Sequence, residues 1–143
     1  MEDSMMHIAY RQAGHAVIAV LLGVEIESAL AMSDRGEIHY QLPSQISDSD
    51  RIMLAISGDV TDELLRSKRH ASWGGMDDDP KWRSLVEQIP EHAQHHYLAR
   101  CRRDTHKLLK RHWASVIGVA QLLATSGTVP GEDIKHIVAR TTR

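Results

Sequence analysis

Several residue types that define a fold class or a chemistry are scarce in this sequence of 143 residues. There is one cysteine, Cys101, so no internal disulfide can form and a reducing, cytoplasmic setting is expected. Phenylalanine is absent, which leaves Leu, Ile, Val, Met and three Trp residues to fill the core. No Gly-x-x-x-x-Gly-Lys-[Ser/Thr] segment occurs, so we expect no ATP site of the P-loop kind. The longest apolar run, Ala16 to Leu22, is far shorter than the roughly 20 residues that cross a bilayer, and we expect no membrane partner.

The chain also lacks a large excess of positive or negative charge, because its formal net charge is −2. A chain of this charge is not an electrostatic nucleic-acid binder as a whole. One segment, 100–111, is nevertheless basic, and it has two interpretations: a solvated helix face, or a docking surface for an acidic partner or nucleic acid. Interleaved aromatic residues and nucleic-acid motifs are missing there, so we predict a solvated face and no nucleic-acid partner.

The length predicts one domain spanning 1–143, and apolar periodicity and turn residues divide it into short elements. A β-hairpin is predicted within 24–42, where β-forming residues flank the turn Ser-Asp-Arg-Gly. Helices are predicted from Asp3 or Ser4 to Gly23, from Asp48 or Ser49 to the basic patch 66–69, from Pro80 to about Ile89, from Glu91 to Thr125 as one long or two nearly continuous helices, and from Glu132 to Ala139. The predicted fold class is therefore mainly α with a small β-hairpin.

The first of these helices carries a narrow polar stripe on an otherwise apolar surface. His7, Arg11 and His15 recur every four residues, and Gln12 follows Arg11, so these side chains share one helical face. A helix that is apolar almost all round is usually buried, and buried polar groups need partners. The stripe should therefore face a metal, a counter-charge or a cleft.

The stripe is part of a motif. Residues 9–16 read Ala-Tyr-Arg-Gln-Ala-Gly-His-Ala, which resembles the His-Glu-Ala-Gly-His-Ala helix of the FtsH-type zinc metallopeptidases. Arg11 stands where that family has its first zinc-binding His, and Gln12 stands where it has the general-base Glu. The resemblance continues through nearly the whole chain, in the segments 34–38, 56–64, 75–79 and 129–134.

The resemblance implies a fold similar to the FtsH peptidase domain standing alone, with zinc as the cofactor. It gives the second ligand position to His15 and, through a Gly-x-x-x-Asp segment, the third to Asp79. Two ligands hold zinc weakly, since a catalytic site normally has three. Arg11 cannot bind a metal and Gln12 cannot act as a base. His7 cannot replace the missing ligand, because eight residues along a helix place it about 12 Å from His15.

These departures predict a degenerate, non-catalytic metallopeptidase-like protein with no bound cofactor. It would act in binding a protein or peptide, or in assembly with related chains, including a homo-oligomer. We further hypothesise that Arg11 takes the vacated metal position and pairs with Asp79. The alternative is that Arg11 extends to solvent and Asp79 only caps a helix.

An active zinc metalloendopeptidase is the competing hypothesis. It would keep His15 and Asp79 and rebuild the site with other residues: His39 or His70 as ligand, and Asp77 or Asp78 as base. A second histidine cluster, His92 with His95 and His96, has metal-ligand spacing but favours a solvated face, because no suitable third ligand is near. Cys101 lies in a helical apolar pattern and is interpreted as a packing residue.

Overall fold

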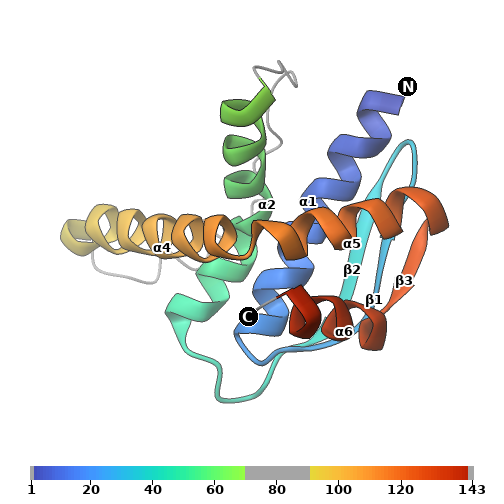
Figure 1. The fold of residues 1–143 in the computed structure, drawn as a ribbon. Helices are drawn as coiled ribbons and strands as arrows, with labels where there is room; N and C mark the ends of the chain where they lie inside the picture. The colour runs from blue at the N-terminus through green and yellow to red at the C-terminus, as the bar shows by residue number, and fades with distance from the viewer. Residues whose placement is uncertain (1, 70–90, 142–143) are drawn as a thin grey trace.

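The computed structural model describes residues 2–69 and 91–141. Its elements, labelled as in Figure 1, are α1 (Glu2–Leu21), β1 (Glu25–Ala31), β2 (Gly36–Gln41), α2 (Asp48–Arg69), α4 (Glu91–Arg111), α5 (Trp113–Ser126), β3 (Thr128–Pro130) and α6 (Gly131–Thr141). The predicted class, mainly α with a small hairpin, is confirmed. The helix predicted from Pro80 to Ile89 lies outside the described residues.

Helix α1 is the element on which the others pack. It contacts every other described element except β3, and in Figure 1 it runs behind α5 and beside the sheet. Small side chains let its neighbours approach: Ala9, Ala13 and Ala16 are fully buried. Aromatic packing also joins α1 to α5: Tyr10 stacks on Trp113 at the start of α5, with ring centroids 6.0 Å apart. The buried, nearly all-apolar helix expected from the sequence is confirmed.

The predicted hairpin is the core of a three-stranded antiparallel sheet with the order β2-β1-β3. Strands β1 and β2 pair from Glu25 opposite Gln41 to Ala31 opposite Gly36, with an irregularity after Ile26. Strand β3 was not predicted. It has three residues, of which only Val129 is buried, so no alternation could mark it in the sequence. The segment is a strand because its backbone pairs with that of β1.

The long C-terminal helical region is two helices, α4 and α5, with the break at His112. Helix α5 ends at Gly127, whose φ of 79° is a left-handed conformation that glycine adopts without strain. Helix α2 begins as predicted, although the cap is Ser47, whose hydroxyl accepts a hydrogen bond from the Asp50 amide. Cys101 is buried within α4, and burial raises the pKa of its thiol, as expected for an inert packing residue.

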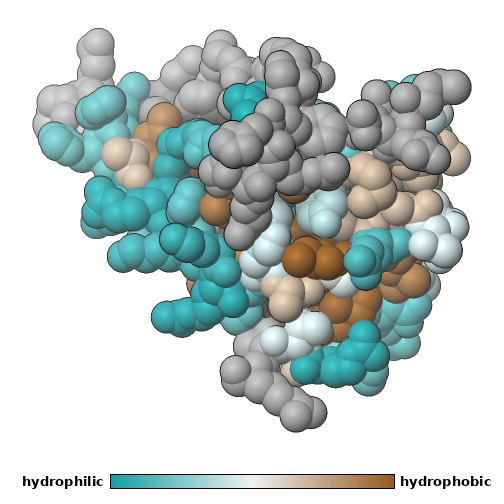
Figure 2. All heavy atoms as spheres, turned by 45° about the horizontal axis from the view of Figure 1, so that its top comes forward, coloured by the Kyte–Doolittle hydropathy of each residue, from teal (hydrophilic) through white to brown (hydrophobic). Residues whose placement is uncertain are grey.

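Helix α4 extends away from the rest of the molecule in Figure 1, and hydrophilic surface covers that side in Figure 2. Most of its basic residues are exposed: Arg100, Arg103, Lys107, Lys110 and Arg111. His95 and His96 are exposed as well. Among the described helices, none combines the length and the apolar character that a membrane span requires.

Candidate functional site

The polar stripe of α1 faces α2, where two aspartates meet it. The Arg11 guanidinium donates through one nitrogen, Nη1, to Asp62 Oδ2 at 2.5 Å and to Asp59 Oδ1 at 3.1 Å. On the preceding helical turn, His7 Nε2 lies 2.8 Å from the other oxygen of Asp62, Oδ1. Asp62 therefore joins His7 to Arg11, and we call these four residues the α1–α2 ion cluster.

The α1–α2 ion cluster is largely removed from water. The Asp62 side chain is fully buried and that of Asp59 is 5% exposed, whereas those of His7 and Arg11 are each 19% exposed. Burial by itself lowers the pKa of the Arg11 guanidinium, but the facing Asp62 and Asp59 carboxylates outweigh it and raise that pKa above the ordinary value. Arg11 is therefore a fixed cation that compensates two buried carboxylates.

Local sequence explains why these groups meet. His7, Arg11 and His15 lie four residues apart on α1, and Asp59 and Asp62 are three apart on α2, so each set occupies one helical face. The α2 face is buried and the α1 face is half-buried, and packing them against each other gives the two aspartates charged partners.

Glycine sets how closely the two helices pack at this site. A Cβ atom on Gly58 of α2 would lie 2.8 Å from His15 Nε2 and 3.0 Å from Arg11 Nη2. The imidazole of His15 and the guanidinium of Arg11 therefore both lie against the backbone of α2 at Gly58, where there is no side chain. The positive charge of Arg11 disfavours the binding of a second cation, such as a metal ion, beside His15 Nε2.

Gln12 has a different environment. A Cβ atom on Gly36, the first residue of β2, would lie 2.6 Å from Gln12 Nε2 and 2.7 Å from its Cγ. The side chain that stands at the general-base position of the resembled motif therefore packs on the start of the hairpin strand. Arg11 and Gln12, adjacent in sequence, contact different elements.

The residues predicted to share the site are only partly brought together. His15 and Arg11 meet, whereas Asp79, the expected partner of Arg11, lies outside the described residues together with His70, Asp77 and Asp78. His39 is on the exposed side of β2, with Nε2 3.6 Å from Glu37 Oε2. Within 2–69 and 91–141, no three His, Cys, Asp or Glu side chains converge as a metal-binding group.

Asp59 and Asp62 are the residues that sequence reasoning missed. A signal was present, because both fall within a stretch of α2 whose other residues are apolar or small, and a charged residue in such a stretch needs a partner. The resembled segment 56–64 drew attention to the helix but not to these side chains. Scans of the chain against models of protein families and against curated proteins find no match.

Proposed function

We propose that this chain is a non-catalytic, metallopeptidase-like domain that binds a protein or peptide segment in extended conformation. The observation that carries the proposal is the position of the Arg11 guanidinium. It is fixed between Asp59 and Asp62 and beside His15, at the position where the FtsH-type motif has its first zinc ligand. A fixed cation here supplies the positive charge that a metal would supply, without the metal's chemistry.

The described residues do not fit a catalytic zinc ion. Arg11 has no lone pair to offer a metal, and its charge opposes a second cation next to His15. Gln12 is neutral and packs on Gly36, so it provides no base. Loss of a general base alone commonly costs about 10² to 10⁴ in rate, and loss of a metal ligand removes the activated water as well. Together these losses support a role in binding.

Strand β2 supports binding of an extended segment. In the described part of the chain, β2 pairs on one side only, with β1, so its other side presents backbone hydrogen-bonding groups. Among the described residues, two large apolar side chains are exposed, each to 44%: Met32, in the turn that leads into β2, and Leu42, directly after β2. A peptide added as a further strand would bond to the backbone of β2 and cover both side chains.

The first test rebuilds the motif. We expect the purified protein, after incubation with zinc, to retain far less than one zinc ion per chain and to cleave no unfolded casein. The double variant Arg11→His/Gln12→Glu restores the His-Glu-x-x-His pattern and should bind close to one zinc per chain, because a divalent cation can then compensate Asp59 and Asp62. Zinc is measured by elemental analysis after removal of free metal.

The control is the same double variant with His15→Ala, which should lose the zinc while keeping its circular dichroism spectrum. Stoichiometric zinc in the unmodified protein, together with casein cleavage that a chelator stops, would show an active enzyme. A folded double variant that binds no zinc would show instead that the scaffold is not of the metallopeptidase kind.

The second test addresses binding. Fluorescein-labelled, unfolded casein should bind to the protein without being cleaved, as measured by fluorescence anisotropy. The variant Met32→Lys/Leu42→Lys should raise the dissociation constant about tenfold or more, because two apolar contacts at the ends of β2 are lost.

Ala114→Lys/Ala139→Lys is the matched control, since it adds the same charge at exposed positions of α5 and α6. Equal weakening by both variants would point to charge rather than to β2. No binding by the unmodified protein would refute the proposed function.

A further inference from the structure

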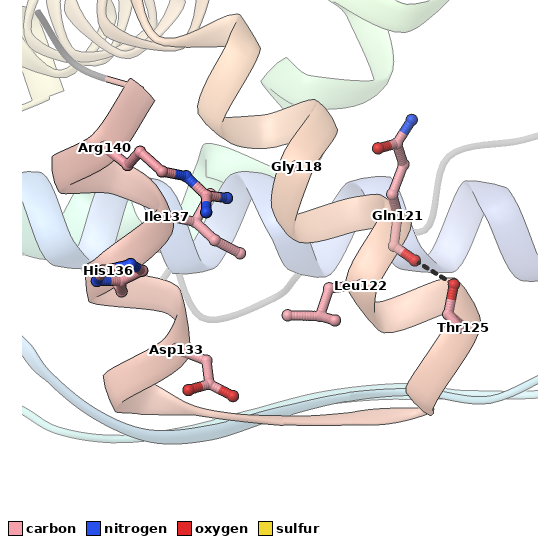
Figure 3. Close-up of a pocket in the computed structure, with 8 residues that line it drawn as sticks. All are labelled: Gly118, Gln121, Leu122, Thr125, Asp133, His136, Ile137 and Arg140. Carbon is pink, nitrogen blue, oxygen red and sulfur yellow. Dashed lines mark hydrogen bonds between the residues drawn. The ribbon is translucent and has the colours of Figure 1, made fainter.

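A groove between α5 and α6 lies apart from the α1–α2 ion cluster. Its volume is about 460 Å³, and residues of both helices line it: Gly118, Gln121, Leu122, Thr125, Asp133, His136, Ile137 and Arg140. Figure 3 shows Leu122 from α5 and Ile137 from α6 pointing into it from opposite sides. The centre of the groove is therefore apolar.

Opposite charges stand at the two ends of this groove. Asp133 and Arg140 are exposed and lie on either side of Ile137 along α6, as Figure 3 shows. Seven residues along a helix return to nearly the same face after about 10 Å, so both side chains border the groove. Within the described part of the chain neither of them takes part in an ion pair.

This arrangement is complementary to itself. Consider a second copy related by a two-fold axis that lies in the interface, crosses the middle of the groove and is perpendicular to α6. Its α6 then lies antiparallel to the α6 of the first copy. Asp133 of each copy then faces Arg140 of the other, and the two apolar centres cover each other. A two-fold interface makes every contact twice, so one favourable pairing of charges on the chain yields two ion pairs.

We propose that this face, formed by α6 and the groove beside it, is a homodimer interface in which two copies pack antiparallel about a two-fold axis. The second copy is the occupant because the charges that α6 presents at the two ends of the groove, negative at Asp133 and positive at Arg140, pair with those of a reversed copy. The proposal does not rest on the proposed peptide-binding function, since it uses none of the residues of β2 or of the α1–α2 ion cluster.

Charge reversal tests the interface. Sedimentation equilibrium of the full chain should show a monomer–dimer equilibrium that weakens with added salt. Asp133→Arg alone and Arg140→Asp alone should each raise the dimer dissociation constant at least about tenfold, because every ion pair becomes a pair of like charges. The double variant Asp133→Arg/Arg140→Asp should restore dimerisation, since both pairs are then re-formed with exchanged signs.

Mixing the two single variants separates the interface from a folding defect. Each should be monomeric alone, and an equimolar mixture should form a heterodimer, because one copy then contributes only cations and the other only anions. Glu132→Arg makes the same charge change at an exposed position of α6 that does not border the groove, and should leave the dimer unchanged. A monomeric unmodified protein at the highest attainable concentration would overturn the proposal, and so would a dimer that is insensitive to these reversals.

Discussion

Replacing Arg11 by methionine is expected to lower the free energy of unfolding by about 3 kcal/mol or more. The substitution keeps most of the apolar length of the side chain but removes the guanidinium that pairs with Asp59 and Asp62. Both carboxylates are almost completely buried, so they would be left in a poorly solvated place without the cation that compensates them. The loss is a large share of the total stability of an ordinary domain, about 5–15 kcal/mol.

Urea unfolding followed by circular dichroism measures this loss. Arg103→Met is the matched control, because it makes the same chemical change at an exposed position and should cost less than about 0.5 kcal/mol. Adding Asp59→Asn and Asp62→Asn to Arg11→Met should recover part of the stability, since no buried charge is then left. If Arg11→Met costs no more than Arg103→Met, the α1–α2 ion cluster does not hold these helices together.

The substitution Gly14→Ala is expected to lower the free energy of unfolding by about 1–3 kcal/mol, even though alanine is the better helix former by about 1 kcal/mol. A Cβ atom on Gly14 would lie 1.8 Å from Thr61 Oγ1 and 2.9 Å from Thr61 Cβ. A change of rotamer cannot move Thr61 Cβ, so α1 and α2 must separate. The same unfolding measurement detects the effect.

Thr61→Gly in the Gly14→Ala background provides the control, because it removes both of the clashing atoms and should recover part of the stability. The effects of Arg11→Met and Gly14→Ala are also linked. Since separation of α1 from α2 lengthens the contacts of Arg11 with Asp59 and Asp62, Arg11→Met should cost less in the Gly14→Ala background than in the unmodified protein. Strict additivity of the two costs would show that Gly14 and the ion cluster act independently.

Local patterns in the sequence were sufficient for most of the secondary structure. The apolar helix that carries His7, Arg11 and His15, the hairpin about the turn 33–36, and the helix end at Gly127 were all predicted and are confirmed. Periodicity, capping residues and turn residues act over a few neighbouring positions, and for that reason they can be read from one sequence. The resemblance to FtsH-type metallopeptidases, and with it the proposed non-catalytic role, stays a prediction that the zinc experiment tests.

By itself the sequence determined that α1 is buried, that its polar stripe needs a partner, and that Arg11 and Gln12 are unsuited to the chemistry of the motif they resemble. Only the tertiary structure decided the identity of the partners. The contact between Arg11 and Asp62 spans 51 positions along the chain. Strand β3 exists only because β1 lies beside it, and the opposed charges of Asp133 and Arg140 gain meaning only from the groove between α5 and α6. Pairing across such separations is fixed by how whole helices and strands pack, which no local pattern encodes.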